Sequence, residues 1–385
     1  MKLTHVNHSS ILCEACSEIL VTDPWFLSNA FGGWYQYPAP KAKVINRIYP
    51  SKNVSIVLLS HAHDDHVDDK YISKLDDRSI VVIPKTGNSG FKNRILKLGV
   101  SHERIYEVNQ ESIQLGAFTI SSIFDGNLSE EDFIFLIGSG NYLFIHANDN
   151  WKSFSQQTLI FINEFVKNNS IDHILMMSQI GIADSFPIFY EGISSQDKRS
   201  IICKKINYMC KSMISNCEKL GIEKGFSYAN QSCFLSLFND LDFDPYILKD
   251  DIINNYHGIY QLYPGDEIIN GQLEKNNNNL NTFLNCRLNS MSTAFFDYCQ
   301  TKKIHLLPVD FCSSDSPLEE NKKDRILISA SPIYWNEILS GSLNLESILT
   351  GGLGIISKPK SYNMKEEYML LVKWAYKFQI IAKQS

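Results

Sequence analysis

The chain has 385 residues, of which 44% are hydrophobic and 20% are charged, and this composition is typical of a soluble globular protein with one large or two smaller domains. The net charge is −6 and basic residues are scattered, which argues against nucleic acid or an anionic membrane surface as the main partner. No apolar run approaches the roughly 18 residues of a membrane span, and the start MKLTHVNHSS lacks the apolar core of a signal peptide, so we expect a cytoplasmic protein.

The first 150 residues are rich in short strand signals. Alternating and continuous apolar runs, separated by Gly, Asn, Asp and Pro, predict strands. The predicted strands are 3–13 and 17–25 as a hairpin, 53–60, 79–84, 117–124, 132–139 and 141–149, with a short helix at 68–75.

After residue 150 the pattern changes to alternating helices and strands. Apolar residues at helical spacing predict helices over 155–168 and 197–221, with a strand at 172–179 between them. Strands followed by strand–helix units predict an αββα sandwich, in which two sheets pack face to face with helices outside.

An Asn-rich run, EKNNNNLNT at 274–282, is expected to be a solvated loop and marks a domain boundary. We predict a catalytic domain over 1–273 and a mainly helical extension over 283–385, with helices at 292–300 and 366–381. The sequence leaves open whether the extension covers the pocket or forms a homodimer interface.

The nine cysteines are expected to be structural. Cys13 and Cys16 form a single CxxC inside the predicted hairpin, without the second CxxC that a zinc site would need. Cys203, Cys210 and Cys217 recur at heptad spacing in a predicted helix, which is typical of a packed face rather than a cluster site.

The stretch SHAHDDHVDD at 60–69 follows the buried strand 53–60. His61 and His63 alternate about Ala62 and can point to one side, and Asp65 and His66 can reach a second position nearby. Imidazole and carboxylate ligands in this arrangement indicate a site for two divalent metal ions. The alternative is a solvated acidic loop with incidental histidines, which a pattern this specific makes less attractive.

The pattern H-x-H-x-D-H resembles that of the metallo-β-lactamase superfamily, as do the early HSS and the Asp-Pro-Trp turn at Asp23. More narrowly, the chain resembles the lactamase-like region of CMP-N-acetylneuraminate hydroxylases. The matching segments are DPWFLSNAFGGWYQYP (23–38), SHAHDDH (60–66), FDGNLSEED (124–132), ANDN (147–150), MMSQIGIADSFP (176–187) and YPGDEI (263–268).

This resemblance implies further ligands. Asp149 corresponds to the carboxylate that bridges the two metals, and Asp125 stands where a histidine usually binds the first, with Glu130 as a second choice. The final histidine of the superfamily has no counterpart at 226–234, so His257 is the weak remaining candidate. A site rich in carboxylates suits iron or manganese better than zinc, and with the resemblance to the hydroxylases iron is expected rather than zinc or manganese.

Several other residues are expected to lie near the metal site. His8 is expected beside the metals or in simple turn packing, and Asp23 is expected to order its turn through backbone amides. Trp25, Trp34 and Gln179 are candidate substrate-binding residues, although the tryptophans could equally anchor a hydrophobic lid. We interpret His146 as a core or edge residue.

Two classes of function follow. The resemblance implies a non-haem di-iron oxygenase acting on a small polar metabolite. The hydroxylases also carry a Rieske domain with Cys-x-His and Cys-x-x-His, which this chain lacks, so electrons would come from a separate donor protein or the substrate. The alternative is a hydrolase of an ester, amide or phosphodiester, in which Asp65 or Asp149 orients a metal-activated water. A degenerate site in a binding subunit is a third reading.

Overall fold

The computed structural model describes residues 1–28, 30–31, 34–36, 40–87, 89–126, 133–181, 186–188, 190, 192–229, 232–234, 245–275, 309–313, 326–331, 334–335, 338 and 354–357. The chain divides into two compact units. The first unit contains Met1–Gln36, Pro40–Ser232 and Ser236–Asn276, and the second contains Asn277–Ser385 with the short segments 37–39 and 233–235. The catalytic and extension roles expected for 1–273 and 283–385 stay predictions.

The first unit contains two large mixed sheets. The eight-stranded sheet has the order β17 (Gln272–Glu274), β16 (Glu267–Ile269), β1 (Lys2–Asn7), β2 (Ser10–Ala15), β3 (Glu18–Thr22), β5 (Ile56–Leu58), β6 (Ile80–Pro84) and β7 (Ile105–Val108). The seven-stranded sheet has the order β15 (Ile259–Gln261), β13 (Gly225–Tyr228), β12 (His173–Gln179), β11 (Tyr142–Asn148), β10 (Phe133–Ser139), β9 (Phe118–Phe124) and β8 (Ile113–Leu115). Two short strands, β4 (Trp34–Gln36) and β14 (Ser232–Phe234), lie outside both sheets.

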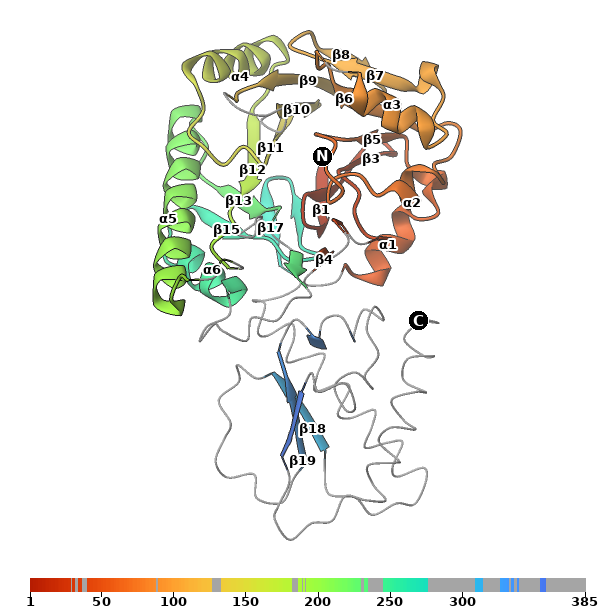
Figure 1. The fold of residues 1–385 in the computed structure, drawn as a ribbon. Coiled ribbons are helices and arrows are strands. Elements are labelled where there is room, and N and C mark those ends of the chain that lie inside the picture. Colours follow the sequence, from red (N-terminus) through yellow and green to blue (C-terminus); the bar gives the residue numbers. More distant parts are fainter. Residues whose placement is uncertain are drawn as a thin grey trace. The chain divides into compact units, whose positions relative to one another are not determined.

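Helices flank this pair of sheets (Figure 1). On the eight-stranded sheet lie α1 (Ala42–Ile48), α2 (Asp69–Ile72) and α3 (Gly90–Lys97), whose buried side chains pack in one cluster with that sheet. On the seven-stranded sheet lie α4 (Gln156–Asn168), α5 (Ser195–Leu220) and α6 (Pro245–Asn254), and α5 packs on β12, β13 and β15. Two 3₁₀ turns, η1 (Ser51–Asn53) and η2 (His102–Arg104), connect elements of the first sheet.

Strand alternation divides the apolar residues between two cores. In β5, Ile56 and Leu58 face the core between the sheets, whereas Val57 belongs to the cluster under the helices. In β6, Val82 faces the core between the sheets, and its neighbours Val81 and Ile83 belong to the cluster under the helices. Because both faces of each sheet are covered, the strands are apolar on both sides. The predicted αββα sandwich is therefore confirmed.

The topology collects several strand ends at one edge of the sandwich. β3 runs parallel to β5, and β11, β12 and β13 run parallel to one another. The residues that follow these strands, which include Asp23, the His61–His66 loop and Asp149, therefore emerge at carboxyl ends, where α/β proteins commonly build their sites.

The described part of the second unit is a small sheet of β18 (Val309–Ser313), β19 (Ile326–Ala330) and β20 (Gly354–Ser357). β18 pairs with β19 in parallel, and β20 pairs with β19 antiparallel. The helices expected at 292–300 and 366–381 lie outside the described residues. Among the described helices of the whole chain, none is long and apolar enough to cross a bilayer.

Candidate metal centre

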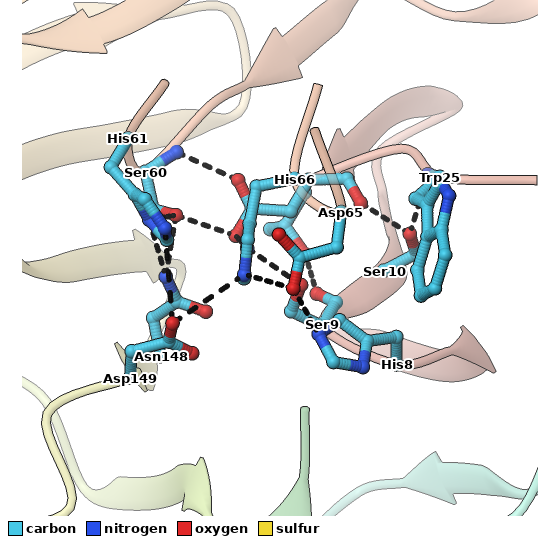
Figure 2. Close-up of polar contacts among 12 residues, drawn as sticks. His8, Ser9, Ser10, Trp25, Ser60, His61, Asp65, His66, Asn148 and Asp149 are labelled. Carbon is cyan, nitrogen blue, oxygen red and sulfur yellow. Dashed lines mark hydrogen bonds and ion pairs between the residues drawn. The ribbon is translucent and has the colours of Figure 1, made fainter. Parts of the chain in front are cut away.

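Three imidazoles and two carboxylates meet at the edge of the sandwich (Figure 2). His66 Nε2 lies 3.5 Å from Asp65 Oδ2 and 3.6 Å from Asp149 Oδ2. His8 Nε2 lies 3.3 Å from Asp65 Oδ2, and His61 Nε2 lies 3.8 Å from Asp149 Oδ2. Two groups of three potential ligands result, one formed by His8, Asp65 and His66 and the other by His61, His66 and Asp149.

Several side-chain atoms of this cluster are buried and have no hydrogen-bond partner among the described residues. They are Nε2 of His8, His61 and His66 and Oδ1 of Asp65 and Asp149, the two carboxylates whose Oδ2 atoms face these nitrogens. Leaving a buried polar atom unpaired costs about 1–3 kcal/mol, so five such atoms in one place would strongly destabilise the fold. A divalent cation would satisfy them together, and the donor set therefore fits a metal site.

The charges in the cluster are strongly coupled. Burial disfavours the charged form of Asp65, but His66 and His8 outweigh it and hold the pKa of Asp65 well below its usual range. Burial also opposes protonation of His66, but the carboxylates of Asp65 and Asp149 raise the pKa of His66 well above 6.5. Burial raises the pKa of Asp149 to about 7. Metal binding would replace the protons of this cluster, because ligands bind metals in their deprotonated forms.

The ring nitrogens that point away from the cluster are held by polar side chains. His66 Nδ1 lies 2.9 Å from Ser9 Oγ and 3.2 Å from Asp23 Oδ2. His61 Nδ1 lies 3.0 Å from Ser60 Oγ and 3.2 Å from Asn148 Nδ2. Such partners fix the orientation of a metal-binding imidazole and leave Nε2 for the metal.

Asp23 is the centre of this outer layer. Its carboxylate is fully buried and accepts hydrogen bonds from Ser60 N at 2.7 Å, Ser60 Oγ at 2.8 Å and His146 Nε2 at 2.9 Å. Burial alone would raise the pKa of Asp23, but the bonds from His146 and His66 outweigh it and lower the pKa. The sequence predicted hydrogen bonds from backbone amides to Asp23, but it did not predict the contacts of Asp23 with His66 and His146.

Three residues at the centre have left-handed backbones although none is glycine. They are His8 with φ 43°, Asp23 with φ 37° and Asn148 with φ 48°. This conformation is uncommon for residues with a Cβ, and it concentrates at functional sites where the surrounding structure imposes it. At His8 the backbone carbonyl accepts a hydrogen bond from Ala229 N, 2.9 Å long, which helps to hold this conformation.

His8 had no settled role in the sequence, and the structure places it within ligand reach. The tight turn between β1 and β2 carries it to Asp65 and His66, and its ring packs edge-on against Trp25 at 5.2 Å. The HSS motif was the only sequence signal for this position.

His63 and Asp125 belong to neither ligand group. His63 is exposed and its ring lies 4.7 Å from that of His61. The Asp125 carboxylate is instead engaged at the start of α4, where it accepts hydrogen bonds from Ser155 N at 3.2 Å and Thr158 Oγ1 at 2.7 Å. The structure thus does not bring Asp125 to the cluster, because its oxygens cap a helix.

The remaining predicted residues fall in different places. Trp25 is fully buried and donates from Nε1 to Ser28 O at 2.8 Å, so it packs behind His8. Gln179 is buried at the end of β12, and its substrate-binding role stays a prediction. His257 is exposed before β15, outside both ligand groups. The Trp34 side chain and Glu130 lie outside what the structure describes.

The neighbouring aspartates of the motif have structural roles. Asp68 is buried and caps α2 by accepting hydrogen bonds from Lys70 N and Tyr71 N. It also accepts from Ser28 Oγ at 2.7 Å, which ties the loop after β3 to the metal-binding loop. Asp64 and Asp69 both pair with Arg94.

Part of the chain matches a known domain family. Residues 2–165 match the sequence model of the Beta-lactamase superfamily domain, and no curated protein sequence matches the chain. Among solved structures, the diiron β-hydroxylase CmlA from Streptomyces venezuelae is 15% identical, with a TM-score of 0.46 over 71% of this chain and 54% of CmlA. This chain therefore matches about half the length of CmlA.

Two other solved structures are similar to a comparable extent. The isothiocyanate hydrolase from Delia radicum gut bacteria is 12% identical, with a TM-score of 0.45 over 71% of this chain and 100% of that one. The metallo-β-lactamase fold protein YhfI from Bacillus subtilis is 14% identical, with a TM-score of 0.41 over 69% of this chain and 98% of that one. Residues 2–165 match the β-lactamase superfamily domain, and the two sheets and flanking helices of the first unit form the metallo-β-lactamase fold.

Proposed function

We propose that this protein is a metal-dependent enzyme with a dinuclear centre, and specifically a non-haem di-iron oxygenase that hydroxylates a small polar metabolite such as an amino sugar, a nucleotide sugar or an amino acid derivative. One observation carries the proposal. The two ligand groups share His66, and each joins two imidazoles to one carboxylate, the combination that holds iron in non-haem Fe(II) oxygenases.

His66 Nε2 is common to both ligand groups, but one nitrogen lone pair binds only one ion. We assign one metal position to His8, Asp65 and His66. The other position falls to His61 and Asp149, with His63 beside them because its ring lies 4.7 Å from that of His61. Asp149 approaches both His61 and His66, which suits a carboxylate that bridges two ions.

When bound, iron would supply the activation of dioxygen. The chain would supply the placement of the ions. Ser9 and Asp23 orient His66, Ser60 and Asn148 orient His61, and the burial of Asp65 limits access of water on its side of the centre. The segments that resemble the hydroxylases, which extend from 23–38 to 263–268, support the same function. Electrons would come from a separate donor protein or from the substrate.

A hydrolase is the second candidate, and the position of His8 favours it. His8 adds an imidazole to the cluster, and the Asp125 carboxylate is occupied at α4, so the donor set is less rich in oxygen than the sequence suggested. Two histidines and one carboxylate also bind catalytic zinc. In this reaction Asp65 or Asp149 would orient the attacking water.

Metal analysis of protein purified without chelators separates the two functions. We expect about two iron ions per chain, as a dinuclear site requires, together with the near-ultraviolet absorption of protein-bound ferric iron. His66→Ala should lose both signals while it keeps its far-ultraviolet circular dichroism. Zinc in place of iron, combined with turnover of bis-p-nitrophenyl phosphate or p-nitrophenyl acetate, would overturn the oxygenase in favour of the hydrolase.

A further inference from the structure

We propose that Tyr228 is a positioning residue for the metal centre, whose single hydroxyl group connects the supports of both ligand groups. The inference rests on the proposed metal-dependent function. Tyr228 ends β13 in the seven-stranded sheet and is fully buried. Its hydroxyl has two partners among the described residues, His146 Nδ1 and Asn148 N, and both belong to β11, which lies beyond β12 in the same sheet.

The first connection runs from Tyr228 to His66. The Tyr228 hydroxyl is hydrogen-bonded to His146 Nδ1, and His146 Nε2 lies 2.9 Å from Asp23 Oδ2. The same Asp23 oxygen lies 3.2 Å from His66 Nδ1. Because the Asp23 carboxylate can only accept, Nε2 of His146 carries the hydrogen donated to Asp23, and Nδ1 of a neutral ring is then the acceptor of the hydrogen bond from the phenol. The phenol thus favours the tautomer of His146 that donates a hydrogen bond to Asp23.

The second connection runs from Tyr228 to His61 and Asp149. Asn148 N donates to the Tyr228 hydroxyl at 3.1 Å, and this residue holds a left-handed backbone with φ 48°. The Asn148 side chain contacts Ser60 Oγ at 2.5 Å and His61 Nδ1 at 3.2 Å, and the next residue is Asp149. The bond to Tyr228 therefore holds the turn that places Asp149 and supports His61.

Only a hydroxyl group at this position serves both connections, since it must donate to one partner and accept from the other. Burial raises the pKa of Tyr228 well above 10.0, so the phenol keeps its proton and stays a donor. In Tyr228→Phe, a buried acceptor on His146 and a buried amide of Asn148 would lose their partner. Loss of such outer support of metal ligands typically weakens metal affinity by about 10–100-fold.

Tyr71 provides a matched control, in the cluster between the eight-stranded sheet and its helices. Tyr71 is also fully buried, and its hydroxyl donates to Ile48 O at 3.2 Å, away from the metal centre. Tyr71→Phe removes one buried hydroxyl with its hydrogen bond, as Tyr228→Phe does, but touches no support of a ligand. A purely structural role for Tyr228 would therefore give the two variants the same metal affinity.

The test is titration of the metal-free full chain with Co²⁺, followed by visible absorption and calorimetry. We expect Tyr228→Phe to bind Co²⁺ about 10–100-fold more weakly and to show an altered ligand-field spectrum at saturation, whereas Tyr71→Phe keeps the wild-type affinity and spectrum. Equal affinity and identical spectra for Tyr228→Phe and wild type would overturn the inference while leaving the metal site intact. A wild-type chain that binds no Co²⁺ would instead overturn the proposed function, and this inference with it.

A second pair of variants covers the case in which Tyr228→Phe does not fold. His146→Gln keeps an acceptor for Tyr228 and a donor for Asp23, and it should retain most of the Co²⁺ affinity. His146→Leu removes both hydrogen bonds and should lose most of the Co²⁺ affinity. If His146→Leu binds Co²⁺ as tightly as His146→Gln, the connection does not position the metal ligands.

Discussion

Asp23 and His66 are joined by a buried contact between Oδ2 and Nδ1, 3.2 Å long, although one follows β3 and the other lies in the loop after β5. The two strands are parallel neighbours, so their carboxyl ends bring the two side chains together. This contact turns Nε2 of His66 toward Asp65 and Asp149. The orientation of a predicted metal ligand thus depends on a carboxylate from another strand.

Asp23→Asn is expected to weaken metal binding by about 10–100-fold. The amide is neutral and offers one acceptor oxygen, while Asp23 now accepts from Ser60, His146 and His66. Calorimetric titration with Fe²⁺ under anaerobic conditions measures the change. Asp172→Asn is the control, because Asp172 is exposed and bonds only to Asn141 among the contacts described. Unchanged affinity in Asp23→Asn would show that His66 is oriented by Ser9 alone.

His8→Ala should lower the metal content from about two ions per chain to one. His8 supplies one of the three potential ligands of the group with Asp65 and His66, and its removal leaves that position with two. Elemental analysis after dialysis against metal-free buffer gives the stoichiometry. His173→Ala serves as the matched histidine variant, since His173 is exposed and stacks on Tyr142. A His8→Ala protein that retains both ions would restrict His8 to packing against Trp25.

The metal-free protein should lose stability as the pH falls from about 6.5 toward 4, in part because of His5. Burial lowers the pKa of His5 from 6.5 to about 4, so in this window the unfolded chain takes up a proton that the folded chain does not bind. Protonation therefore favours unfolding, and the loss is complete near pH 4. At about 1.4 kcal/mol per pKa unit, the contribution of His5 is about 3 kcal/mol.

Urea unfolding of the metal-free chain at pH 7 and pH 5 checks this expectation. His5→Gln keeps a donor for the carbonyl of His8, which His5 Nε2 contacts at 3.0 Å, but cannot titrate. Its stability should fall less between the two pH values than that of the wild type. Equal losses would mean that His5 makes no contribution to acid sensitivity, and that other buried groups such as His8 and His61 account for it.

Phe31 should contribute to the choice of substrate. Its side chain is 48% exposed, and its ring lies edge-on to His63 at 5.7 Å, so a ring on a metal-bound molecule would meet it. In the metal-loaded protein, Phe31→Ala should reduce the preference for benzohydroxamate over acetohydroxamate by about 2–10-fold, which corresponds to an aromatic contact of 0.5–1.5 kcal/mol. Competition binding gives both affinities.

Tyr106→Ala provides the comparison for Phe31→Ala. Tyr106 is 39% exposed on β7, the outermost strand of the eight-stranded sheet. This variant should keep the wild-type preference for benzohydroxamate. If Phe31→Ala also keeps the wild-type preference for benzohydroxamate, Phe31 does not contact the bound molecule.

The fold could be predicted in large part from local pattern. Alternation of apolar residues predicted most strands of the sandwich, and helical spacing predicted α4 and α5, because long, strongly periodic segments leave few alternatives. Shorter elements such as α1, α3 and β13 were not predicted, since they contain few turns or residues and their stability comes from tertiary packing, of the two helices on the eight-stranded sheet and of β13 in the core between the sheets.

The candidate centre could be predicted only in part. The local motif predicted His61, Asp65 and His66, and Asp149 followed from the resemblance, and the structure brings these four together. Asp125 was expected there as well, but the helix start at Ser155 and Thr158 engages its carboxylate. Sequence spacing cannot show such competition for a side chain, because the two segments become neighbours only in the folded chain.

The His61–His66 loop could be predicted from the sequence as a metal-binding segment at the end of a buried strand, because the motif and the strand consist of residues that are neighbours in the chain. The tertiary structure alone decided that His8 lies within ligand reach of Asp65, that Asp23 and Tyr228 support the ligands, and that Asp125 does not join them. These contacts form between strands from different parts of the chain, and the register of those strands and the left-handed turns at His8, Asp23 and Asn148 set their geometry.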